Sequence, residues 1–188
     1  MPLGMLLLPP VWEKLTRPRY FYERGTFEPA FPLLKAAESL FRDMNVQGCQ
    51  GSLAAIYNTR AALETECNLF QQAYDDFKAQ IDCVERAIET GELKRPCLTE
   101  VFALGGVGNG LQGLNNYTEA EEYYRRAIDA YSKFPQESLP LTELSVAPTN
   151  LATCLWLQGK LEEAETLLKS IIKDRDDTRN YRYIIINF

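Results

Sequence analysis

One pattern constrains the fold of this chain more than any other: an alanine that returns four times in a similar setting. Four segments align on it, namely GTFEPAFPLLKAA, NLFQQAYDDFKAQ, NNYTEAEEYYRRA and GKLEEAETLLKSI. The alanines are Ala30, Ala73, Ala120 and Ala164, at spacings of 43, 47 and 44 residues. Self-similarity at such a period is the signature of repeat architectures, so a stack of small structural units is expected.

The residues around each alanine predict a pair of helices. Five positions earlier stand residues that tolerate the left-handed conformation ending a helix: Gly25, Asn68, Asn115 and Gly159. Apolar residues recur three before, four after and seven after the alanine, as on one face of a helix. They are Phe27, Phe70, Tyr117 and Leu161, then Leu34, Phe77, Tyr124 and Leu168, then Ala37, Ala127 and Ile171. Gln80 breaks the last series, and Ile81 is expected to replace it.

Twelve positions before each alanine stand Pro18, Ala61, Gly108 and Ala152, of which three are very small. A small residue lets two helices approach closely, so each unit is expected to be helix, turn, helix. The prolines are departures: Pro18 and Pro148 are expected to kink or end a first helix. Loops are predicted over 91–97 and 133–141, and a long second helix over about 70–90.

The phased copies resemble a tetratricopeptide repeat array over roughly residues 11–175. The period resembles that of kinesin light chains. YFYERGTFEPAFPLLKAA and NLATCLWLQGKLEEAETLLK look like repeats that follow the nucleotide-binding module of fungal NACHT or NB-ARC-type proteins. The resemblance implies an all-α, right-handed α-solenoid of about four helix pairs. One domain over 1–188 would hold repeats at about 11–45, 52–93, 97–134 and 141–175, then an apolar tail at 176–188.

Composition excludes several classes of function. The chain has no histidine, so Ser-His-Asp and Cys-His mechanisms are impossible, and no metal site or cofactor is expected. A net charge of −6 argues against nucleic-acid binding. Five scattered cysteines indicate reduced thiols in a cytoplasmic protein. MPLGMLLLPP lacks the features of a signal peptide, and no apolar run is long enough for a membrane span.

The stretch GGVGNGLQG, residues 105–113, spells the G-x-G-x-x-G of a dinucleotide site. That fingerprint needs a preceding strand, and a P-loop needs Lys and Ser or Thr where this chain has Leu111 and Gln112. We therefore expect no binding of ATP or NAD. Gly108 is interpreted as the packing residue of its repeat. The other glycines either pack closely as well or clear space for a ligand.

Helical spacing places a further set of residues on the concave groove that the resemblance implies. The expected groove residues are Asn58, Thr59, Thr65, Gly105, Asn109, Gln112, Asn150, Thr153 and Trp156. Amide side chains both donate and accept hydrogen bonds, so they suit an extended peptide backbone. The Lys and Arg clamp by which some relatives hold two carboxylates is missing, and only Arg19 and Arg60 could lie near.

Three functions remain open from the sequence. The first is a non-catalytic scaffold that binds a peptide or partner helix in the groove. The second is a small-molecule binder or enzyme of fungal specialised metabolism, with acid and base groups from Tyr57, Glu64, Glu66 or Glu100. The third is a self-assembling fragment of a larger scaffold. YIIINF, within 183–188, is apolar and strand-like, so a homodimer through a terminal segment is favoured over a tail that folds back.

Overall fold

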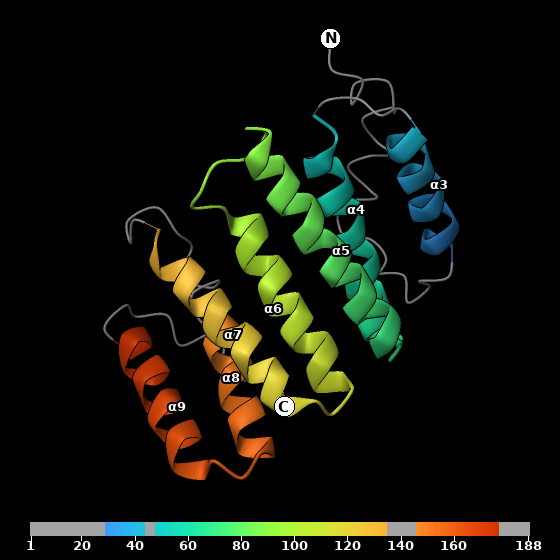
Figure 1. Cartoon of the computed structure of the whole chain (residues 1–188). Helices are drawn as coiled ribbons and strands as arrows, with labels where there is room; N and C mark the ends of the chain where they lie inside the picture. The colour runs from blue at the N-terminus through green and yellow to red at the C-terminus, as the bar shows by residue number, and fades with distance from the viewer. Residues whose placement is uncertain (1–28, 44–47, 135–145, 177–188) are drawn as a thin grey trace. The chain divides into compact units, whose positions relative to one another are not determined.

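The computed structural model describes residues 29–43, 48–134 and 146–176, and these ranges contain helices and no strands (Figure 1). The prediction of an all-α fold is confirmed. With the labels of Figure 1, the helices are α3 (Ala30–Asp43), α4 (Gln50–Glu66), α5 (Phe70–Glu89), α6 (Leu98–Gly113), α7 (Tyr117–Ser132), α8 (Val146–Leu157) and α9 (Leu161–Asp176). The expected first helix near 11–24 and the tail at 176–188 lie outside these ranges, apart from Asp176.

The chain divides into two compact units, 1–99 and 100–188. In the first unit α4 packs against both α3 and α5. In the second unit α8 packs against both α7 and α9, and α7 also contacts α6 through Tyr124. The helices therefore follow one another as α4 with α5, α6 with α7 and α8 with α9, which is the predicted helix, turn, helix unit.

Each of these pairs is joined by the predicted left-handed turn residue. The φ angles are 58° at Asn68, 61° at Asn115 and 78° at Gly159. After Asn68, for example, the backbone N–H of Leu69 donates to the carbonyl of Glu64 over 2.8 Å. This bond satisfies a carbonyl that the end of the helix would otherwise leave unpaired. Gly25, the fourth predicted turn residue, lies outside the described ranges.

The phased small residues form the helix contacts. All four aligned alanines are buried, and so are Ala61, Gly108 and Ala152. Three details differ from the expectation. Gln80 is itself buried, so Ile81 does not replace it, and Leu168 on α9 is 41% exposed. Pro148 neither ends nor interrupts α8, because it lies in the first turn, where a missing N–H breaks no helical bond.

GGVGNGLQG forms the C-terminal half of α6 and follows other helical residues of α6 rather than a strand. A Cβ added to Gly108 would stand 2.6–2.9 Å from three atoms of the Tyr124 ring on α7. The interpretation of Gly108 as the packing residue is confirmed. A Cβ on Gly105 would meet nothing within 4 Å.

The surroundings of these two glycines predict that alanine substitutions change the free energy of unfolding in opposite directions. Gly108→Ala should lower the free energy of unfolding by about 1–3 kcal/mol, because the buried Tyr124 ring has to move. Gly105→Ala should raise it by up to about 1 kcal/mol, because alanine favours the helix and has room. Urea unfolding followed by circular dichroism measures both. Equal effects of the two substitutions would contradict the packing assignment.

Candidate functional site

In the second unit, residues at intervals of three and four form one row along α6 and another along α8. The row on α6 contains Phe102, Gly105, Asn109 and Gln112, and the row on α8 contains Val146, Thr149, Thr153 and Trp156. Asn150 connects the helices, because its Nδ2 donates to Asn109 Oδ1 over 2.9 Å. We call these two rows, with Asn150, the α6/α8 face. It unites the six groove residues that the sequence predicted in this unit.

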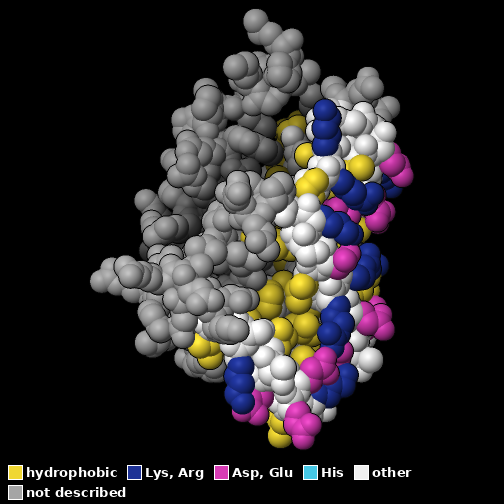
Figure 2. Space-filling model, turned by 90° about the vertical axis from the view of Figure 1, so that its left-hand side faces the viewer, with side chains coloured by type: hydrophobic (Ala, Val, Ile, Leu, Met, Phe, Trp, Pro, Cys, Tyr) yellow, Lys and Arg dark blue, Asp and Glu magenta, His cyan; other side chains and the backbone are white. Residues whose placement is uncertain are grey.

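The α6/α8 face combines exposed apolar groups with amides. Trp156 is 62% exposed, and Phe102 and Val146, which the sequence analysis did not include, are also exposed. On the face of the molecule that Figure 2 shows, hydrophobic side chains gather beside charged ones. Exposed aromatic residues beside hydrogen-bonding groups are typical of binding surfaces.

Two of the three amides on the α6/α8 face are held by one buried hydroxyl. Tyr124 OH lies 2.9 Å from both Asn109 Oδ1 and Gln112 Oε1. Burial raises the pKa of Tyr124, so the hydroxyl keeps its proton. One proton cannot serve two acceptors, so one of the two amides presents its NH₂ to the tyrosine oxygen instead.

Two arrangements of the amides satisfy this network. In the first, Asn109 presents its NH₂ outward, and Gln112 and Asn150 present their oxygens. In the second, all three amides are rotated, so Asn109 presents its oxygen, and Gln112 and Asn150 present their NH₂ groups. In both, the face offers donors next to acceptors. We call the network of Tyr124, Asn109, Gln112 and Asn150 the amide relay.

The other three predicted groove residues lie in the first unit, on α4. Thr59 is only 2% exposed and its hydroxyl donates to the carbonyl of Ala55, so it is not accessible to a ligand. Thr65 is half-buried and donates to the carbonyl of Ala61. Asn58 is half-buried, between the buried Ala54 and Ala61 on the same side of α4.

The first unit also contains an ionic cluster that the sequence analysis did not find. The guanidinium of Arg60 on α4 bridges two helices: it donates to Glu38 on α3 over 2.5 Å and to both carboxylate oxygens of Asp76 on α5, one of them over 2.6 Å. Tyr57 donates to Glu38 over 2.7 Å and accepts from Arg42. The Arg60 guanidinium lies 5.3 Å from the centre of the Tyr57 ring.

A signal for this cluster was present in the repeat alignment. Three positions in the first helix of the third repeat are apolar: Leu104, Val107 and Leu111. The same positions of the second repeat hold Tyr57, Arg60 and Glu64. In the fourth repeat the last two of these positions hold Leu151 and Leu155. Polar residues in a stripe that is otherwise apolar indicate buried ion pairs. Only the small residue of this stripe is used in the sequence analysis above, so the cluster is not predicted there.

Glu64 is the unusual member of the ionic cluster. It is 8% exposed, and its Oε2 has no hydrogen-bond partner among the described residues. Burial, and then the neighbouring Asp76, raise its pKa to about 8. Glu38 shows the opposite direction. Burial alone would raise its pKa, but hydrogen bonds from Arg60 and Tyr57 outweigh burial and lower it.

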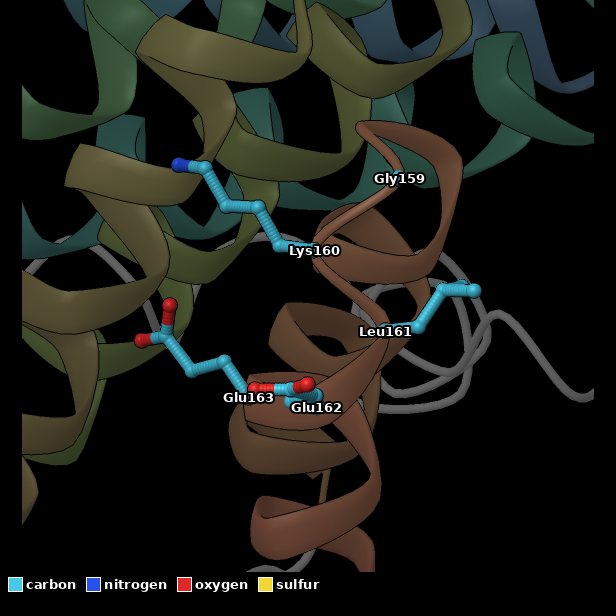
Figure 3. A pocket seen from close by; sticks show the side chains of 5 residues that line it. All are labelled: Gly159, Lys160, Leu161, Glu162 and Glu163. Carbon is cyan, nitrogen blue, oxygen red and sulfur yellow. The ribbon is translucent and has the colours of Figure 1, made fainter.

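A hollow at the turn between α8 and α9 has a structural role. In Figure 3, Lys160 and Glu163 extend toward the neighbouring helix, and Leu161 points away. Lys160 pairs with Glu121 of α7 over 2.6 Å, and Glu163 pairs with Arg125. Burial would raise the pKa of Glu121, but the bonds from Lys160, Gln158 and Arg125 lower it to about 2.

Residues 103–133, which span most of α6 and α7, match the family model of the tetratricopeptide repeat. This match supports the predicted repeat family for that segment, and the helix pairs on either side share its architecture. No curated protein matches the chain. Within the described ranges, no group of three or more acidic residues or cysteines could hold a metal ion, and no helix is both long and apolar enough to cross a membrane.

The raised pKa of Glu64 predicts how the stability of the protein depends on pH. Between its ordinary pKa of 4.5 and its folded value of about 8, the unfolded chain releases a proton that the folded protein keeps. The free energy of unfolding therefore falls as pH rises through this window, by at most about 1.4 kcal/mol per pH unit. Glu38 acts in the opposite direction, because its lowered pKa costs stability only below about 4.5.

Glu64→Gln should remove most of the fall in stability, because a neutral amide replaces the protonated carboxyl. The variant should unfold at a higher urea concentration than the wild type at pH 8 and at a similar one at pH 5. Glu66→Gln, at an exposed position on the same helix, is the matched control and should follow the wild type. A Glu64→Gln variant with the wild-type pH dependence would contradict the assignment.

Proposed function

We propose that the protein is a non-catalytic interaction module whose α6/α8 face binds an extended peptide segment. The amide relay carries the proposal, because in either arrangement it presents donors beside acceptors next to the exposed ring of Trp156. An extended backbone presents the complementary N–H and C=O groups. Tetratricopeptide repeats commonly mediate protein–protein interaction, which agrees with this role.

The α6/α8 face supports recognition of backbone more than of a defined side-chain sequence. Its described polar groups are amides and threonine hydroxyls, which carry no charge. Trp156 supplies a flat apolar surface for one side chain of the bound segment. The open space above Gly105 leaves room for the backbone to approach α6.

An enzyme is the less favoured alternative. Of the four acid or base candidates, Tyr57 and Glu64 belong to the ionic cluster, and the Tyr57 hydroxyl is bonded to Glu38 and Arg42. Glu66 is exposed on α4, and Glu100 lies in the other unit at the start of α6. These positions support structural roles for Tyr57 and Glu64 and give no shared catalytic site.

The proposed family relationships, the class of partner, the absence of a cofactor and the location rest on the sequence. The long period supports a relationship to kinesin-light-chain repeats, and two segments support one to fungal NACHT or NB-ARC-type proteins. The charge of −6 supports a partner other than nucleic acid. The absence of histidine and of a phosphate-binding motif supports function without a cofactor, and the unpaired cysteines of the described ranges support a cytoplasmic location.

A random peptide library displayed on phage tests the proposed function. We expect the chain to enrich peptides with one preferred aromatic or large apolar position and otherwise tolerant sequences. Trp156→Ser should weaken binding of the enriched peptides about tenfold or more, because one aromatic contact often carries much of the binding energy of a small interface. Affinity is measured by fluorescence anisotropy with labelled peptides.

Leu33→Ser is the matched control for Trp156→Ser. Leu33 is 49% exposed and lies on α3 in the first unit, outside the α6/α8 face. Peptides that bind Trp156→Ser as tightly as the wild type would refute this site, and so would a library that yields no binder.

We also propose a homodimer through a terminal segment. Three large apolar side chains of α9, Leu161, Leu168 and Ile172, are exposed, so the last helix pair presents apolar surface. Apolar surface that a repeat leaves exposed is commonly covered by another segment or another chain. The segment at 183–188 has the composition for it, although it lies outside the described residues.

Deletion of residues 181–188 should convert a dimer to a monomer, as measured by light scattering at about 100 µM, well above a micromolar dissociation constant. A full-length chain that is monomeric at this concentration would exclude the dimer. A truncated chain that still dimerises would place the interface elsewhere.

A further inference from the structure

Arg60 lies among three carboxylates, one from each of the helices α3, α4 and α5. All three nitrogens of its guanidinium already donate, two of them to Asp76 on α5 and one to Glu38 on α3. The third carboxylate belongs to Glu64, one turn after Arg60 on α4, and its Oε2 accepts no hydrogen bond from the described residues. Glu64 is therefore the member of the ionic cluster whose negative charge is least compensated.

The surroundings of Glu64 keep its proton in place at neutral pH. Burial raises the pKa of Glu64 most, Asp76 and Asp75 on α5 raise it further, and Arg60 lowers it, which leaves it at about 8. The neutral carboxyl also donates a hydrogen bond to Asp76, and this bond is lost when the proton leaves. Glu64 thus changes from a hydrogen-bond donor to a poorly compensated carboxylate just above neutral pH.

An ionised Glu64 competes with Glu38 for Arg60. Arg60 and Glu64 are four residues apart on α4, the spacing at which a helix brings opposite charges together. Glu38 has a second partner on its own helix, because Arg42, four residues later on α3, pairs with it over 2.9 Å. One ion pair between α3 and α4 can therefore be exchanged for two ion pairs that each lie within a single helix.

Helix α3 depends on the ion pair with Arg60 more than α5 does. α4 packs extensively on α5 but over a shorter contact on α3, where apolar side chains such as Leu34 and Ile56 meet. Tyr57 also donates to Glu38, and it keeps its proton in this pH range, because burial raises its pKa above the ordinary value of 10. Loss of the bond between Glu38 and Arg60 therefore weakens the attachment of α3 first.

We propose that the proton on Glu64 holds α3 against α4, and that its release loosens α3. With the proton in place, Arg60 bridges α3 and α5. Once the proton leaves, Arg60 turns toward Glu64, and Glu38 retains Arg42 on its own helix. Helix α3 then opens from α4 more often and uncovers the apolar side chains of α4 beneath it. The accessible surface of the first unit thereby depends on pH.

Hydrogen exchange measured by mass spectrometry on the full chain reports the opening of α3 separately from that of other helices. Variants are compared with the wild type at the same pH, because the chemical exchange rate of an amide itself rises with pH. At pH 9, α3 should exchange several-fold more slowly in Glu64→Gln than in the wild type, whereas at pH 6 the two should agree. Glu66→Gln, at an exposed position on α4, is the matched control and should follow the wild type. Equal exchange of α3 in Glu64→Gln and the wild type at pH 9 would overturn the proposal.

Removal of the charge of Glu38 separates the exchange of partners from a general loss of stability at high pH. In a Glu38→Gln background, α3 has no ion pair with Arg60 to lose, so the addition of Glu64→Gln should not slow its exchange at pH 9. If Glu64→Gln slows the exchange of α3 by the same factor with and without Glu38, the two carboxylates do not compete for Arg60 and the proposal is wrong.

A second comparison needs only Glu38→Gln, so it remains decisive if circular dichroism shows that Glu64→Gln does not fold. At pH 6, α3 should exchange several-fold faster in Glu38→Gln than in the wild type, because the variant lacks the ion pair with Arg60. At pH 9 the two rates should converge, since the wild type has then lost the same ion pair. A difference of the same size at both pH values would refute the release of α3 by Glu64.

Discussion

The contact between Gly108 and the ring of Tyr124 determines how closely α6 and α7 approach each other. It also positions the surface chemistry of the second unit. Because the ring lies directly against a residue without a side chain, its hydroxyl reaches Asn109, the next residue, and Gln112, one turn further along α6. A single buried side chain thus connects the packing between two helices with the orientation of the amides on the α6/α8 face.

The sequence was sufficient to predict the helix pairs because those depend on local rules. Asn68, Asn115 and Gly159 adopt the left-handed conformation for which Asn and Gly are suited, and the phased alanines are buried. The sequence predicted the burial of individual side chains less well. Thr59 is on the expected helix but is buried, and whether a residue on a helix is accessible depends on the neighbouring helices, whose rotation the repeat pattern does not specify.

The ionic cluster shows this limit most clearly. The sequence identifies Tyr57 and Glu64 only as isolated acid or base groups, because their partners Glu38 and Asp76 lie on other helices. The repeat pattern specifies how far apart the helix pairs lie along the sequence. It does not specify which residues of α3 lie opposite which residues of α4. Replacing an apolar stripe by paired charges adds little stability, because burial of charge is costly, but it makes the contact between these helices selective for the matching partners.

The amide relay has a directional consequence. Its two arrangements present opposite patterns of donors and acceptors, and rotation of three amides together converts one pattern into the other. A peptide backbone that runs along the α6/α8 face reverses its own order of N–H and C=O groups when its direction is reversed. A face with the relay can therefore match a chain of either polarity, whereas a groove whose donors are fixed backbone N–H groups accepts only one.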